Sequence, residues 1–166
     1  GHLGMTALGY AAEVPRRAGE FVIEYPATKS QDLLSTRLKG QRLTMLAFVS
    51  TTCPHCHTLA QNLSRIQKEY GAKGFQAIIV AFDADATANL SRFKALYADG
   101  ISVGLSNRGA VHTFLQLSMI GPSYIPKLVV IDEKGMIQEQ YSGGEAYFDS
   151  AREEANLRAS IAKHLK

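Results

Sequence analysis

The chain has 166 residues, of which 46% are apolar and 20% are charged, and its formal net charge is +3. This length is typical of one domain with a full hydrophobic core. The small, evenly spread charge argues against a nucleic-acid partner. No apolar run approaches the roughly 18 residues that a membrane-spanning helix needs. Two cysteines are too few for a disulfide-stapled scaffold, and they leave the cellular compartment open.

The start of the chain does not look native. Gly1-His2 ahead of the internal Met5 indicates the remnant of an expression tag, so a signal peptide or membrane anchor would be hidden. Residues 6–19 are weakly patterned. We therefore expect a loose N-terminal arm over residues 1–19 and a folded domain over residues 20–166.

The first elements follow from alternation and capping signals. Residues 21–25 alternate enough to predict a strand. Ser30 is a candidate N-cap for a short helix over residues 31–38, which Gly40 would end. The apolar run 43–49 predicts a buried strand.

Alternating helices and strands follow in the middle of the chain. Residues 57–70 predict an amphipathic helix. Residues 75–82 predict a strand covered on both faces, because its apolar residues do not alternate. Residues 87–97 predict a second helix. Its inward-facing side chains are expected to be Leu90, Phe93, Leu96 and Tyr97.

The last third predicts a short strand, a helix, a hairpin and a closing helix. Their expected ranges are 101–105, 107–117, 127–132 paired with 136–141, and 149–165. His57, His112 and His164 are expected on exposed helix faces. This order predicts an α/β layer fold with parallel strands in its first half and an antiparallel pair in its second.

Cys53-Pro54-His55-Cys56 contains the only two cysteines of the chain, three positions apart. Only about 1 in 80 random placements of two residues has this spacing, so the spacing carries information. The motif lies between the 43–49 strand and the following helix. Two thiols at such a corner form a candidate redox pair, with Cys53 at the helix N-terminus and Cys56 one turn inside.

The residues around the two thiols suit thiol–disulfide exchange, in which the thiolate is the nucleophile. The helix N-terminus favours an anionic sulfur on Cys53. Pro54 suits the first helical position, where its missing N–H needs no partner. His55, if cationic or donating to the sulfur, would stabilise the thiolate further and make the disulfide form more oxidising. Cys53 and Cys56 are therefore the expected attacking and resolving thiols, with Pro54 and His55 as tuning residues.

A second element, Ile125-Pro126, begins the 127–132 strand. A proline that enters a strand needs a structural reason. Together, the Cys53–Cys56 motif, the two apolar strands and the stretch from Ile125 to Gly135 resemble the thioredoxin superfamily. Within it, residues 20–165 resemble the TlpA/ResA-type thiol–disulfide oxidoreductases, also grouped as redoxin or AhpC/TSA-type domains, with a DsbA-like Cys-Pro-His-Cys motif.

The resemblance implies a three-layer thioredoxin-like fold, with a central mixed β-sheet and helices on both faces. It implies that Pro126 is cis and lies against the two sulfurs, and that Ile125 offers its backbone to an extended substrate segment. Thr52, which stands where the family usually has Trp, is a further candidate for substrate contact. The implied partners are protein thiols or disulfides and a redox recycling partner.

No cofactor, metal, nucleic acid or membrane segment is expected, and we expect a monomer. An extracytoplasmic or periplasmic location, with a membrane anchor in the full-length protein, is implied by the family alone.

The chain also departs from the family pattern. The positions where relatives carry a carboxylate proton acceptor hold Ala47 and Leu59. Lys127 follows the proline where cytochrome-maturation members often have Glu. The resemblance therefore gives neither the substrate nor the direction of electron flow.

Three alternatives stay open. Cys53-x-x-Cys56-His57 is also a c-type haem attachment pattern, with Met119 as a conceivable distal ligand. The same two cysteines and His57 could hold a metal, although three ligands do not close a tetrahedral site. A thiol peroxidase of the redoxin group is the third alternative, although Leu46 and Ser50 replace the proline and threonine of the peroxidase signature.

Overall fold

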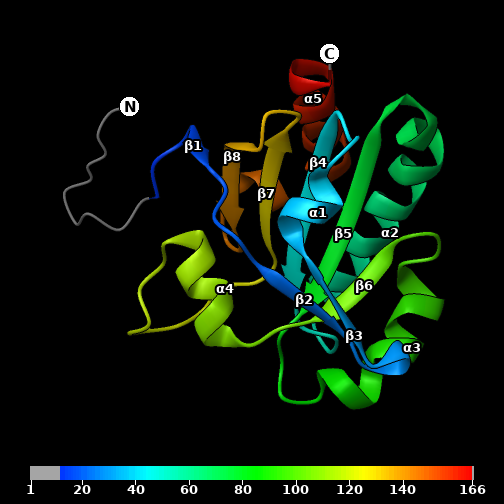
Figure 1. The fold of residues 1–166 in the computed structure, drawn as a ribbon, viewed down its shortest axis with the longest axis vertical. Helices are drawn as coiled ribbons and strands as arrows, with labels where there is room; N and C mark the ends of the chain where they lie inside the picture. The colour runs from blue at the N-terminus through cyan, green and yellow to red at the C-terminus, as the bar shows by residue number, and fades with distance from the viewer. Residues whose placement is uncertain (1–11, 166) are drawn as a thin grey trace.

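Eight strands form one mixed sheet in the computed structural model, which describes residues 12–165 (Figure 1). Their order across the sheet is β1-β8-β7-β4-β5-β6-β2-β3. The strands are Arg16–Arg17 (β1), Val22–Tyr25 (β2), Ser30–Leu33 (β3), Leu43–Val49 (β4), Phe75–Ala81 (β5), Ser102–Leu105 (β6), Lys127–Asp132 (β7) and Met136–Ser142 (β8). The helices are Leu34–Leu38 (α1), Pro54–Tyr70 (α2), Ala86–Tyr97 (α3), Arg108–Leu115 (α4) and Glu153–His164 (α5).

The two central strands, β4 and β5, are parallel, and every residue in them is buried. Their unbroken apolar runs suit this position, because a strand covered on both faces has no solvent side. β7 pairs antiparallel with β4, and β8 returns antiparallel to β7. Parallel pairing in the first half of the chain and an antiparallel hairpin in the second are both confirmed.

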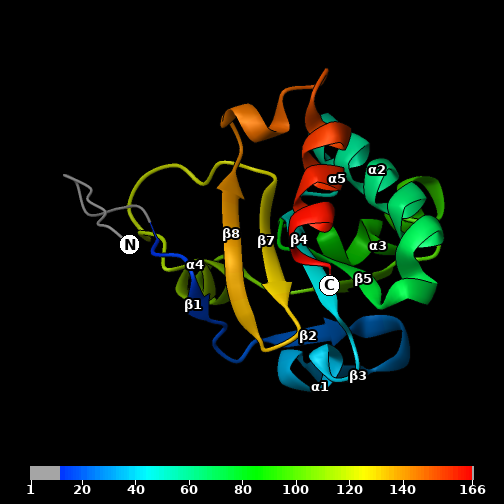
Figure 2. The same ribbon diagram turned by 90° about the horizontal axis from the view of Figure 1, so that it is seen from above.

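Helices cover both faces of the sheet, as Figures 1 and 2 show. On one face, Met45 and Val49 of β4 pack in a core with residues of α2, α3 and α5. On the other face, Leu46 and Phe48 pack with residues of α1 and α4. The alternation of side chains along a strand divides β4 between the two cores. The expected α/β fold, a mixed sheet between two helical layers, is confirmed.

The sheet brings the cysteine motif and the proline strand to the same edge. Phe48 of β4 is paired with Lys127 of β7. Cys53 follows the end of β4, and Pro126 precedes the start of β7. The two segments therefore meet at one end of adjacent strands, although more than seventy residues separate them in the chain.

The helix predicted over residues 31–38 is partly wrong. Residues 30–33 form β3, which pairs antiparallel with all four residues of β2, and the helix begins only at Leu34. Ser30 lies opposite Tyr25 in this hairpin rather than capping a helix. The ladder satisfies the backbone of a polar segment whose side chains give no strand pattern.

The two ends of the described chain also differ from expectation. Arg16–Arg17 is not a loose arm but a short edge strand against Ile137 and Met136 of β8. The closing helix begins at Glu153, after a short 3₁₀ turn at Ala146–Phe148, rather than at 149. The tag remnant inferred at the N-terminus lies outside the described residues. No helix in the described part of the chain is long and apolar enough to cross a bilayer.

Three side chains lie differently from the sequence prediction. Leu96 was expected to face inward but is 54% exposed. His112 is buried instead of exposed, because the segment that follows α4 folds over it and its ring bonds to the Ser118 carbonyl and the Ser123 hydroxyl. His164 is also largely buried and bonds to Glu139. Helical periodicity alone could not anticipate these partners.

Candidate functional site

Cys53 occupies the N-cap of α2. Its backbone is extended, and its Sγ accepts the backbone N–H of Cys56 at 3.3 Å. Pro54 takes the first helical position, as expected. The sulfur therefore occupies the place where a Ser or Asp side chain would cap a helix, beside N–H groups that favour negative charge.

Cys56 lies one turn farther along α2, and the structure describes both cysteines as free thiols. Cys56 is fully buried, whereas Cys53 is partly exposed. Burial raises the pKa of the Cys56 thiol, and the neighbouring Cys53 and the negative charge of Asp83 raise it further. The two sulfurs therefore differ in access to a partner, with Cys53 outside and Cys56 shielded.

The Ile125–Pro126 peptide bond is cis, as the family resemblance implied. Pro126 is buried, while Ile125 is partly exposed and packs against the same core as Cys53. Gly143, just after β8, lies directly behind Ile125, so closely that a Cβ at position 143 would overlap the Ile125 carbonyl. Direct contact between Pro126 and the two sulfurs stays a prediction.

His55 is held from behind by α5. Its Nε2 lies 2.9 Å from Oε1 of Glu153, and Oε2 of the same carboxylate accepts a hydrogen bond from Asn62 at 2.7 Å. Edge-to-face packing against Phe148 fixes the other side of the imidazole ring. The ring is therefore tied to the interior, and its Nε2 points to the carboxylate.

A second carboxylate borders the motif from the end of β5. Asp83 accepts hydrogen bonds from the backbone N–H and the hydroxyl of Thr51, at 2.8 and 2.7 Å. His57 bonds to the Thr51 carbonyl and stacks on Tyr97, so it is not the solvated residue that the sequence predicted. Thr52 is exposed beside this cluster. These contacts fix the segment that leads from β4 into Cys53.

Sequence reasoning missed Glu153 and Asn62. A signal was present for Glu153, because it shares the spacing of Leu157, Ser160 and Ile161, which are all buried on one face of α5. An acidic residue in register with an apolar stripe indicates a buried carboxylate that needs partners. The sequence could not identify those partners, because they lie on α2.

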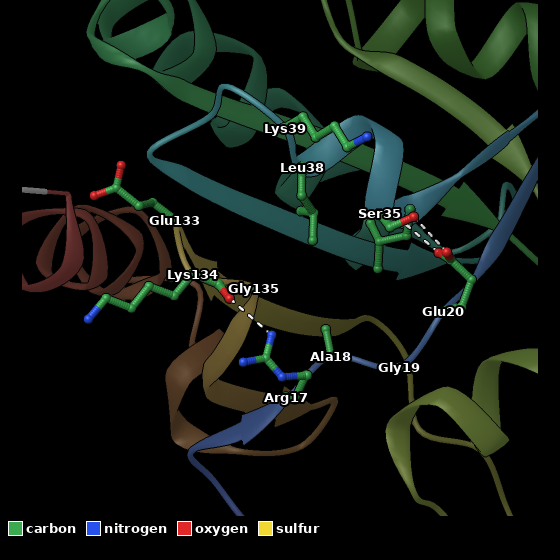
Figure 3. A pocket seen from close by; sticks show the side chains of 11 residues that line it. Arg17, Ala18, Gly19, Glu20, Ser35, Leu38, Lys39, Glu133, Lys134 and Gly135 are labelled. Carbon is green, nitrogen blue, oxygen red and sulfur yellow. Dashed lines mark hydrogen bonds between the residues drawn. The ribbon is translucent and has the colours of Figure 1, made fainter.

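A surface pocket of about 380 Å³ lies at the opposite end of the sheet (Figure 3). Residues 17–20, 34, 35, 38, 39 and 133–135 line it, near the start of β4, where Leu43 pairs with Asp132. Its polar groups bond to one another, as Glu20 does with Ser35. The pocket is therefore remote from the cysteines.

Within residues 12–165, no three His, Cys, Asp or Glu side chains are grouped to hold a metal ion.

Comparison with known families assigns this domain to a family. Residues 16–159 match the family model described as Redoxin. The chain belongs to the redoxin family. No curated protein sequence matches the chain significantly. This match confirms the redoxin family that the sequence predicted, and the solved structures described below confirm the thioredoxin-like fold; a closer relation to the TlpA/ResA-type enzymes stays a prediction.

Solved structures share the fold of this redoxin domain at low sequence identity. A Chlorobium tepidum protein named as a candidate thiol:disulfide interchange protein DsbE is 23% identical, with a TM-score of 0.75 over 92% of this chain and 97% of its own. A thioredoxin-family thiol:disulfide interchange protein from Chlorobium tepidum TLS is 20% identical, with a TM-score of 0.72 over 94% and 100%. A candidate protein disulfide isomerase from Bacteroides thetaiotaomicron is 23% identical, with a TM-score of 0.70 over 95% and 92%.

Proposed function

We propose that this redoxin domain exchanges disulfides with protein partners through Cys53 and Cys56. The observation that carries the proposal is the N-cap position of Cys53, whose sulfur accepts the Cys56 N–H while the second thiol is buried one turn inside. An accessible sulfur in a positive environment suits nucleophilic attack. The shielded Cys56 thiol, in the same turn of α2, suits the second attack, which releases the partner from Cys53.

In the reductive direction, the Cys53 thiolate attacks one sulfur of a partner disulfide. A Cys53–partner disulfide forms, and the other partner sulfur leaves as a thiolate. The Cys56 thiol then loses its proton and attacks the Cys53 sulfur, which forms the Cys53–Cys56 disulfide and releases the second partner thiolate. Two electrons pass to the partner, and the two protons lost by the pair are balanced by protonation of the partner thiolates. The oxidative direction is the reverse of these steps.

The partner segment is proposed to dock as an extended strand on the backbone of Ile125, beside Pro126 and Thr52. The partly exposed Ile125 and the exposed Thr52 support this placement. Protein thiols or disulfides would be the substrates, and a second redox protein would recycle the pair. We also propose an extracytoplasmic location, because disulfide exchange serves proteins in oxidising compartments.

The test is the reduction of insulin disulfides by the purified protein with dithiothreitol as the electron source. Cys53→Ala should reduce the rate to that of dithiothreitol alone, because no attacking sulfur remains. Cys56→Ala should also lose turnover, but it should accumulate mixed disulfides that non-reducing gel electrophoresis and mass spectrometry detect.

The matched control is Thr58→Ala, which changes an exposed residue of the same helix and should keep the wild-type rate. Full activity in both cysteine variants would refute the proposal. If the wild-type protein consumes hydrogen peroxide but does not reduce insulin, the peroxidase alternative replaces disulfide exchange.

A further inference from the structure

A buried acid lies directly behind the cysteine motif. The Glu153 side chain is 1% exposed, and its two oxygens bond to different residues of α2, His55 and Asn62. His55 itself is still 36% exposed on its outer side. The imidazole thus joins the buried carboxylate to the first turn of α2, two residues after the N-cap Cys53.

Few neighbouring groups stabilise the negative charge of the buried Glu153 carboxylate. Removal from water raises the pKa of the Glu153 carboxyl, and the bonds from Asn62 and His55 act in the opposite direction. Arg65 approaches this group only indirectly, because its guanidinium bonds to Asn62 and to Glu154. Among the residues bonded to Glu153, His55 is the one that can take up a positive charge.

We propose that Glu153 is a positioning residue that holds the His55 imidazole in the first turn of α2 and, through it, makes the Cys53–Cys56 disulfide a stronger oxidant. This inference rests on the proposed function, because it concerns the same redox pair. A carboxylate in contact with an imidazole favours the imidazolium. A cation in the first turn of α2 then favours the Cys53 thiolate, and hence the reduced form of the pair.

The direction in which the redox equilibrium changes separates this role from a direct electrostatic effect of Glu153 on Cys53. A negative charge acting directly on Cys53 would disfavour the thiolate, so its removal would make the disulfide more oxidising. Acting through His55, the same carboxylate favours the thiolate, so its removal makes the disulfide less oxidising. A purely structural Glu153 would change the stability of the fold and leave the redox equilibrium unchanged.

The experiment is equilibration of the purified protein with glutathione buffers at pH 7, followed by alkylation of free thiols and mass spectrometry. The reaction converts the protein disulfide and two glutathione thiols into the protein dithiol and one glutathione disulfide. We expect Glu153→Gln, which keeps the shape of the side chain, to lower the constant for this reaction roughly fivefold, equivalent to about 20 mV.

Two controls isolate the contact with His55. Glu154→Gln removes the same charge from the neighbouring residue of α5, which pairs with Arg65 and Arg158, and it should leave the constant unchanged. In a His55→Gln background, Glu153→Gln should no longer lower the constant. An unchanged or higher constant in the single Glu153→Gln variant overturns the proposal, as does an equal decrease in the Glu154→Gln protein.

A second variant keeps the test decisive if Glu153→Gln does not fold. Asn62→Ala removes the other hydrogen bond to the carboxylate and should lower the constant in the same direction by a smaller factor; no decrease overturns the proposal. The failure of the proposed function would look different, because the wild-type pair would then stay reduced at every glutathione ratio. A wild-type pair that titrates normally, with variants of unchanged constant, refutes the role of Glu153 alone.

Discussion

Lys127 places an amine in the interior, one residue after Pro126. Its side chain is 2% exposed, and its Nζ donates to the Tyr124 carbonyl at 2.6 Å. The pKa of this amine is lowered to about 8, first by burial and then by the charge of Arg108, while the charge of Glu145 opposes the shift. Alternation along β7 places Lys127 on the α4 face with Val129, whereas Leu128 packs on the side of Cys56. Lys127 thus supports the Tyr124 segment from the face opposite the cysteines.

The lowered pKa of Lys127 predicts that the free energy of unfolding increases with pH in the alkaline range. An unfolded lysine keeps its proton up to a pKa of about 10.4, so from about pH 8 to 10 the unfolded state binds more protons and folding stability rises with pH. Relative to Lys127→Met, the wild-type protein should gain on the order of 1 kcal/mol in free energy of unfolding between pH 7 and 10. Urea denaturation of both proteins across this range measures the difference. A constant difference would show that the amine titrates normally.

At the scale of elements, the end of β8 supports the segment that enters β7. There is no room for a side chain at Gly143, because a Cβ there would overlap the carbonyl oxygen, the carbonyl carbon and the backbone nitrogen of Ile125. The Ile125 backbone, which we propose as the docking edge for a partner, therefore depends on a glycine in the neighbouring connection. This dependence is steric.

Gly143→Ala should displace the Ile125 backbone and reduce the rate of insulin reduction several-fold, while the glutathione equilibrium of the cysteines stays close to wild type. The reason is that the added methyl group acts on the docking edge and not on the α2 N-terminus. Gly19→Ala is the matched control, because nothing lies within 4 Å of a Cβ at that position. Equal rates for the two alanine variants would contradict the supporting role of Gly143.

At the scale of the whole molecule, the C-terminal segment completes the site from outside the sheet. α5 packs on α2 and supplies Glu153, and Phe148 of the preceding 3₁₀ turn packs against His55 (Figure 2). The helix is anchored at its far end by Glu139, which accepts from Ser160 and His164. The environment of the motif therefore exists only when the last helix is docked.

Because the groups that favour the Cys53 thiolate come together only on folding, redox state and folding stability should be coupled. We expect the reduced protein to be more stable to urea than the oxidised protein, on the order of 1 kcal/mol, despite the chain entropy that a cross-link removes. A variant with both cysteines changed to serine should unfold identically in reducing and oxidising buffers. A more stable oxidised form would indicate that the fold does not favour the dithiol.

Features whose signals are local could be predicted from the amino-acid sequence. The spacing of Cys53 and Cys56, the apolar run 43–49 and the proline at position 54 predict a thiol pair at a strand-to-helix corner, because each depends on residues within a few positions of the others. The family resemblance supplied the cis bond at Pro126. Uninterrupted apolar runs also predicted the buried central strands, since a strand covered on both faces leaves its composition in the sequence.

The tertiary structure alone decided which distant residues complete the site. The partner of His55 is Glu153, 98 positions away, and the partner of Thr51 is Asp83, 32 positions away. The strand at 30–33 exists because β2 offers an edge to pair with. These contacts join elements that only the assembled sheet and the docked α5 bring together, and no local pattern encodes which carboxylate will face which ring.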